Sequence, residues 1–306
     1  MENSYFILAK HKFEIERFHL CTWDLKKDNA HIEFGFEIAH DSFKNIEERE
    51  IVFIINVPYL VKKDTITCLY KELIDSETNR FIFNDTSLGR ENINNKNTNE
   101  GVIENFVERG KLAIVPCDYE LNEENNIILK VKNKKEIDCN IYFRIILSID
   151  KKTLAELSKD ITKISYTYDI RLNERRNLTS HLEKYIYDSN LSFCNIKTFF
   201  CFHIYPIDFS IAYVTQNKLK SVRRLENENF KKYLPFIKSL SNPKKKYEIL
   251  FNKDSARESY SLYSILAKES IGYKQVFLAI IVNILCSFGF FVLSNLDKIK
   301  ELFIKG

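Results

Sequence analysis

Residues 276–296 read VFLAIIVNILCSFGFFVLSNL, and no charged residue lies between Lys274 and Asp297. At about 1.5 Å of rise per residue, a helix of this length covers roughly the 30 Å of hydrocarbon in a bilayer. The alternative is a buried core helix, but a soluble domain of this size rarely needs so long an uncharged run. The sequence therefore predicts one transmembrane helix at 276–296, followed by a short tail at 297–306.

The orientation of this anchor is predicted from the N-terminus. The apolar run at residues 5–9 is too short for the core of a signal peptide, and the acidic residues Glu14 and Glu16 follow it. Lysines lie on both sides of the predicted helix, so their number does not fix the topology. We therefore expect a single-pass protein of the cell membrane with a cytoplasmic N-terminal part.

The composition indicates a large core and excludes several common sites. Of 306 residues, 45% are hydrophobic and 24 are Phe, so the part ahead of the anchor can bury a substantial interior. The seven glycines form neither GxGxxG nor GxxxxGK[ST], which argues against classical Rossmann and P-loop nucleotide sites. The seven cysteines are scattered without a CxxC pair, and we expect reduced thiols with no metal and no cofactor.

Residues 1–150 have the pattern of a β-rich domain. Residues 32–38 alternate between apolar and other side chains, and residues 51–57 form a nearly continuous apolar run that Pro58 ends. Further short runs occur at 80–83, 112–115, 126–131 and 141–149. Many short strands separated by turn-forming clusters predict a β-sandwich, with the Asn-rich residues 84–101 as a long surface loop.

A smaller α+β domain is expected at 151–255. It begins with a linking helix at 151–163 and continues with a strand at 164–172, a helix at 178–187, strands at 198–205 and 209–214, and a short helix near Pro235. Residues 256–275 are expected as a juxtamembrane connector. The overall expectation is a mostly β, sandwich-like domain, a smaller mixed domain and one C-terminal transmembrane helix.

The densest charged cluster is a candidate anion site. It comprises Asp169, Arg171, Glu174, Arg175 and Arg176. Arginine suits phosphate because its planar guanidinium donates two parallel hydrogen bonds. We favour the alternative, a solvated strand end with local ion pairs, because charge runs at turns are common and contribute little.

A second basic feature spans residues 218–246. Its basic residues include Lys218, Lys220, Arg223, Arg224, Lys244, Lys245 and Lys246. A segment like this, close to a membrane anchor, can rest on anionic headgroups of the lipid bilayer. Nucleic acid or a nucleotide is the competing partner, with Tyr233 and Phe236 as stacking residues, and an ordinary solvated face is the third interpretation. We favour the membrane surface.

The predicted transmembrane helix carries a stripe of small and polar residues, Ala279, Asn283, Ser287 and Ser294. Such residues on one face let helices approach closely and form hydrogen bonds in lipid. Asn283 is costly at bilayer depth unless it is paired. The stripe therefore predicts self-association, with a plain anchor as the equally weighted alternative.

No family signature or catalytic motif emerges from these residues. The spacing of Cys194, Cys201 and His203 matches no standard zinc site. The leading hypothesis is a membrane-anchored, non-catalytic binding or sensing module that oligomerises through its transmembrane helix, a plan that by analogy suits a bacterial defence effector. The alternatives are a membrane-tethered enzyme acting on a phosphate-containing or lipid substrate through Asp169, Arg171, Glu174 and His181, and a structural subunit of a membrane complex.

Overall fold

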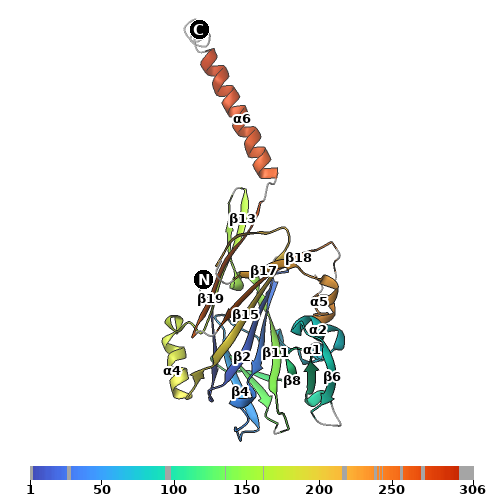
Figure 1. Ribbon diagram of the computed structural model, residues 1–306. Helices are drawn as coiled ribbons and strands as arrows, with labels where there is room; N and C mark the ends of the chain where they lie inside the picture. The colour runs from blue at the N-terminus through green and yellow to red at the C-terminus, as the bar shows by residue number, and fades with distance from the viewer. Residues whose placement is uncertain are drawn as a thin grey trace.

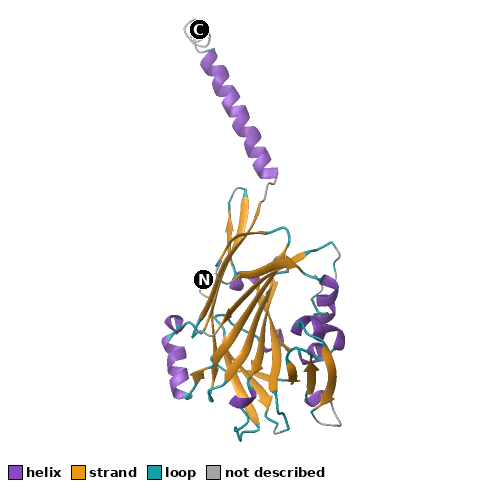
Figure 2. Cartoon of the chain, viewed as in Figure 1, coloured by secondary structure: helices purple, strands orange, loops and turns teal. Residues whose placement is uncertain are grey.

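Two large sheets packed face to face form the body of the protein, and one long helix extends from it (Figure 1). The computed structural model describes residues 3–25, 29–93, 98–134, 136–160, 162–215, 219–237, 240, 242, 244–255, 258–269 and 273–295. Strands dominate this part of the chain (Figure 2), which confirms the predicted mostly β fold. The tail at 297–306 and Lys218 lie outside the described residues.

The first sheet has the strand order β16-β19-β13-β1-β4-β10-β9, with β12 beside β13 and β14 beside β1. Its strands are β1 (Asn3–Ala9), β4 (Glu50–Asn56), β9 (Asp118–Leu121), β10 (Asn126–Lys132), β12 (Glu156–Lys159), β13 (Lys163–Leu172), β14 (Ser192–Phe193), β16 (Ser210–Val214) and β19 (Tyr260–Glu269). The apolar run predicted at 51–57 is β4, which lies inside the sheet between β1 and β10.

The second sheet has the order β17-β18-β15-β2-β3-β11-β8-β7-β6, with β5 beside β11. Its strands are β2 (Glu14–Trp23), β3 (Asn29–Ile38), β5 (Ile66–Cys68), β6 (Ser87–Asn92), β7 (Val102–Phe106), β8 (Gly110–Ile114), β11 (Asn140–Asp150), β15 (Asn195–Pro206), β17 (Leu219–Arg224) and β18 (Tyr247–Ser255). Their inward side chains meet those of the first sheet in one large apolar cluster.

The two halves of the chain contribute to both sheets. In the first sheet β1 pairs in parallel with β13, and in the second β2 pairs in parallel with β15. The main apolar cluster accordingly joins residues of both segments, such as Phe18 and Phe199, whose rings stack 5.9 Å apart. Strands from 1–150 and from 151–269 thus share one core, and β19 lies within the segment 256–275 that the sequence presents as a connector.

Short helices cover the outer faces of the two sheets (Figure 1). On the first sheet, α4 (Ser180–Asp188) packs Leu182 against Phe6 and Leu8 of β1. On the second sheet, an apolar cluster joins α1 (Tyr70–Leu73), α2 (Ser76–Phe83) and α5 (Asn227–Tyr233) to the strands beneath. Both sheets are therefore covered only in part, which leaves stretches of outer face open.

Three local predictions are wrong. Residues 80–83 are not a strand but the last turn of α2, because the Asp75 carboxylate caps that helix by accepting hydrogen bonds from the N–H groups of Glu77 and Thr78. Residues 84–101 are not one loop, since β6 lies within them and pairs with β7.

The linking helix expected at 151–163 is the third error. Only α3 (Lys151–Leu154) is helical, and β12 follows it and pairs with β13. Strand β1 pairs with only the last three residues of β13, so the earlier part of that edge is open to β12. An available sheet edge outweighs the weak helical periodicity of this segment.

Helix α6 (Tyr273–Ser294) extends away from the sandwich (Figure 1). Within the part of the chain that the structure describes, it is the one helix long and apolar enough to cross a membrane, over Val276–Ser294. None of this span is buried against the rest of the protein, so the alternative of a core helix does not hold. The helix is a candidate membrane anchor.

A buried charged network lies on the outer face of the second sheet. The Arg144 guanidinium donates to Glu33 Oε2 at 3.0 Å, and the Tyr233 hydroxyl donates to the same oxygen at 3.1 Å. The Trp23 indole N–H donates to Glu33 Oε1 at 2.7 Å. The two charged side chains are less than a tenth exposed, so each depends on its partners to offset the loss of water.

We predict that Arg144→Met destabilises the protein by about 3–5 kcal/mol, because it leaves the Glu33 carboxylate buried and unpaired. The measurement is urea unfolding of the full chain in mild detergent. The matched control is Arg176→Gln, which removes an exposed arginine paired with Glu174 and should lower the free energy of unfolding by less than about 1 kcal/mol. Equal effects of the two substitutions would contradict the prediction.

Between the sheets, the His203 ring contacts Tyr168, and its Nδ1 atom forms a hydrogen bond with the Thr22 hydroxyl. Burial, aided by the charge of Lys151, lowers the pKa of His203 to about 3. The ring is therefore neutral in the folded protein at any pH where the protein is ordinarily handled.

This histidine should make stability depend on pH. Below the ordinary histidine pKa of about 6.5, His203 binds a proton in the unfolded chain but not in the folded protein. The free energy of unfolding therefore falls as the pH drops from 6.5 toward 3. One such histidine contributes a slope of up to about 1.4 kcal/mol per pH unit. His203→Gln should flatten the slope measured by urea unfolding between pH 4.5 and 6.5, and an unchanged slope would show that His203 is not responsible.

Candidate functional site

The charged cluster predicted as an anion site forms ion pairs between close neighbours in sequence. Arg171 Nη2 lies 2.7 Å from Asp169 Oδ2, and the two side chains share one face of β13, as their spacing predicts. Arg176 Nη2 lies 2.9 Å from Glu174 Oε2, and the Glu174 pKa falls to about 2 because Arg176 stabilises the carboxylate. This is the arrangement that the local ion-pair interpretation expects.

The two remaining residues of this region lie near α4. The Arg175 guanidinium lies over the Phe193 ring, 5.0 Å from its centroid, at the wall of a shallow surface hollow that Lys12 and Glu14 also line. His181 is exposed in the first turn of α4.

The basic segment is divided between an edge strand and a turn. Lys220, Arg223 and Arg224 lie on β17, the edge strand of the second sheet, and are exposed. Arg223 forms an ion pair with Glu226. The other described members of the segment, Lys244, Lys245 and Lys246, are exposed just before β18. Their proximity to lipid remains a prediction.

The predicted association stripe lies on α6, and Ala279, Asn283, Ser287 and Ser294 are all exposed. The Ser294 hydroxyl donates to the Phe291 carbonyl of its own helix at 3.1 Å. Asn283 lies in the middle of the apolar span, where an amide in lipid is stabilised by a hydrogen bond to another helix.

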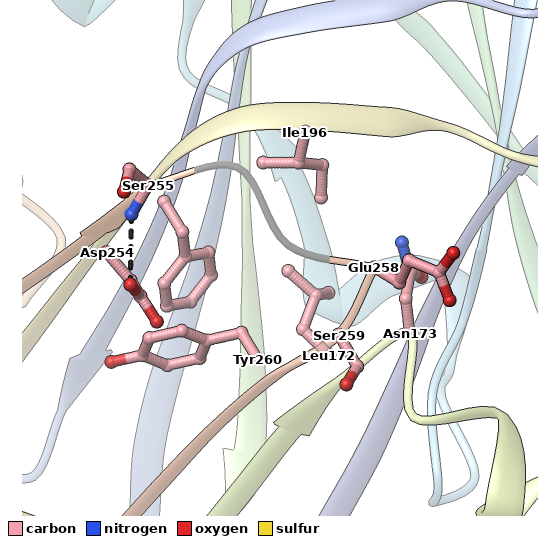
Figure 3. Close-up of a pocket in the computed structure, with 9 residues that line it drawn as sticks. Leu172, Asn173, Ile196, Asp254, Ser255, Glu258, Ser259 and Tyr260 are labelled. Carbon is pink, nitrogen blue, oxygen red and sulfur yellow. Dashed lines mark hydrogen bonds between the residues drawn. The ribbon is translucent and has the colours of Figure 1, made fainter.

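Figure 3 shows a pocket between the ends of the two sheets, lined by Leu172 and Asn173 after β13, Ile196 of β15 and Tyr260 of β19. The Tyr260 ring lies 3.9 Å from the Phe199 ring, centroid to centroid. The free volume is only about 20 Å³, room for about one water molecule. This pocket is too small to bind a metabolite.

A much larger groove opens on the outer face of the second sheet. Its volume of about 790 Å³ lies within the range of ligand pockets. Strands β2, β15, β18 and β17 form its floor, the end of α2 and the β7–β8 turn form one wall, and the start of α5 forms another. We call it the arginine groove after its four arginines, Arg17, Arg80, Arg109 and Arg223.

Two of these arginines converge on one carboxylate oxygen. Arg109 Nη1 donates to Glu37 Oε2 at 3.3 Å, and Arg17 Nε lies 3.6 Å from the same atom. The other Glu37 oxygen accepts a hydrogen bond from the Asn140 amide at 3.2 Å. Burial and the charge of Arg17 lower the pKa of Arg109. Arg17 and Arg109 thus share the Glu37 carboxylate beside open space, and the charge of Asp85 also acts on Arg109. Two guanidinium groups held side by side are donors that suit an anion.

Nearby groups hold Arg109 in place, and the lining of the groove also includes the carboxylates of Asp85, Glu108 and Glu226. Arg109 Nη2 donates to the Phe83 carbonyl at 3.1 Å, and its guanidinium lies over the Phe83 ring. The Asp85 carboxylate accepts hydrogen bonds from the backbone N–H groups of Thr86, Glu108 and Arg109. Those bonds hold the pKa of Asp85 below its usual value against the opposing effect of burial.

The floor of the arginine groove is aromatic. Phe200, Phe202 and Phe251 stand on neighbouring strands with nearly parallel rings, and all three are half-buried. His19 continues the row, with its ring 5.0 Å from that of Phe200. Burial and the charges of Arg144, Arg109 and Arg17 lower the pKa of His19 well below 6.5, so this ring is neutral.

Neither the models of known protein families nor the curated proteins include a match to this chain. The function is therefore argued from the groove and the helix alone.

Sequence reasoning did not find the arginine groove. Arg17 and Arg109 are far apart in sequence, and neither belongs to a charge run. One usable signal was the alternation at 14–23, which places Arg17 and His19 on the same strand face. The other was the spacing of two between Phe200 and Phe202, which repeats a large apolar side chain on the face opposite to the core.

Proposed function

We propose that this chain is a membrane-anchored binding module that recognises an anionic ligand in the arginine groove and associates with further copies of itself through α6. The observation that carries the proposal is the convergence of Arg17 and Arg109 on the single carboxylate of Glu37 at the wall of an open groove. An anion that replaces water there would gain charge-assisted hydrogen bonds from both guanidinium groups.

The anchor supports the second half of the proposal. No residue of Val276–Ser294 is buried in the single chain, and the amide of Asn283 has its best partner in another helix within lipid. Binding at the groove and association of α6 would together make a sensor of the kind that suits a bacterial defence effector. The cell membrane, with the sandwich on its cytoplasmic side, is the location that we propose for it.

Arg17→Gln should weaken anion binding at least about tenfold, because it removes one of two charged donors. Inorganic pyrophosphate is the probe, and isothermal titration of the full chain in mild detergent is the measurement. The thermal midpoint of the unliganded protein should hardly change, because Arg109 remains on Glu37. Arg176→Gln is the control and should bind as the wild type does. Binding unaffected by Arg17→Gln would remove the proposed site.

Asn283→Leu should shift the full chain from oligomer toward monomer, because an interhelical amide bond in lipid contributes about 1–2 kcal/mol. Light scattering after size exclusion in mild detergent gives the mass. Ile281→Leu changes a residue on the opposite side of the helix and serves as the control. A wild-type monomer, or an oligomer that survives the substitution, would refute association through this stripe.

A further inference from the structure

We propose that the ligand of the arginine groove is a nucleoside polyphosphate, with its base stacked on Phe251 and its phosphates held by Arg17 and Arg109. This inference rests on the proposed function of the groove as an anion site and names the class of anion. It is argued from the spacing of the aromatic rings, from the residue that follows them across the sheet, and from the distance to the membrane.

The aromatic rings form a column whose spacing is set by the sheet. Phe202 of β15 and Phe251 of β18 are directly paired in the register, and their rings lie 4.8 Å apart with an angle of 8° between their planes. This distance equals the separation of neighbouring strands. Phe200 is parallel to Phe251 within 2°. Half-buried phenylalanines side by side in a groove present an apolar patch that suits a flat ligand.

The column ends at a small residue. On the next strand, β17, the residue paired with Phe251 is Ser221, which is exposed and lines the groove. A serine side chain is too short to stack on the neighbouring ring, so β17 supplies no aromatic side chain at the position that a fifth ring of the column would take. A nucleobase fits this position because every base has an aromatic face that stacks on phenylalanine.

The distance from the proposed base position to Arg17 indicates how many phosphates the nucleotide carries. From Ser221 on β17 to Arg17 on β2 the path crosses three strand spacings, and the register places Ser221 level with Cys21, four residues along β2 from Arg17, so the direct separation is on the order of 19 Å. The single phosphate of a nucleoside monophosphate lies too close to its base to reach so far. A ribose with a fully extended triphosphate comes nearest to bridging the distance, with the negative charge at the end where Arg17 and Arg109 share Glu37.

The groove also lies away from the membrane-facing end of the sandwich. That end is marked by Ser210, the first residue of β16, which pairs with Ala267 near the end of β19. Strand β15 runs toward it and ends at Pro206, six residues beyond Phe200, or roughly 20 Å along the strand. A lipid headgroup at the surface would not reach the aromatic floor, whereas a soluble nucleotide would.

The test compares adenosine, guanosine, cytidine and uridine triphosphates with inorganic pyrophosphate, by isothermal titration of the full chain in mild detergent. We expect at least one nucleoside triphosphate to bind about tenfold or more tightly than pyrophosphate, because stacking adds to the contacts of the phosphates. Ser221→Phe fills the base position and should remove this advantage while pyrophosphate still binds. Ser221→Ala is the matched control and should retain the advantage.

Each outcome has one meaning. Pyrophosphate binding as tightly as every nucleoside triphosphate, or an advantage that survives Ser221→Phe, overturns the nucleotide inference and leaves the anion site standing. Binding of none of these probes overturns the proposed function as well. Tighter binding of a single-stranded decanucleotide than of any triphosphate would assign the groove to nucleic acid instead.

Discussion

The parallel pairing of β2 with β15 is the contact on which the rest of the structure depends. It runs from Glu14 beside Asn195 to Trp23 beside Ile204, and it joins parts of the chain about 180 residues apart in sequence. Parallel neighbours need a long crossover, so this pairing forms only after most of the chain is available. It also places the Arg17 face of β2 beside the Phe200 face of β15, and the arginine groove exists because of that juxtaposition.

Charged side chains on the outer face of the second sheet lie in two different environments. Under α5, Glu33 and Arg144 are buried and surrounded by hydrogen-bond partners, so that part of the face is structural. A few residues away the sheet opens into the arginine groove between α2 and α5, where Arg17 and Arg109 share the Glu37 carboxylate. Two guanidinium groups held beside open space contribute little to stability, and this contrast with the satisfied network is what supports the proposal that the groove binds a ligand.

The sequence predicted individual strands better than their partners. Alternation located β3, and the run at 51–57 located β4, because burial on one or both faces leaves a local pattern. No local pattern says that β13 lies beside β1, or that an open edge will convert residues 156–159 into a strand. The arginine groove was not predicted for the same reason, since the densest local charge lies at Asp169 and Arg171, whereas the groove gathers isolated residues from distant strands.

The relation between groove and anchor limits how binding can be transmitted. No residue of Val276–Ser294 is buried against the described part of the sandwich, so a shift of packed contacts has no route from the groove into the helix. The membrane anchoring that we propose would supply confinement instead, because copies held in one membrane meet at a higher effective concentration than copies in solution. Under the proposed function, a weak interaction at Asn283 is then sufficient for association, once ligand binding promotes contact between the β-sandwiches of neighbouring copies. The proposed mechanism therefore requires neither a rigid connection between the sandwich and α6 nor a conformational change within α6. It requires only a ligand that alters contacts between neighbouring copies.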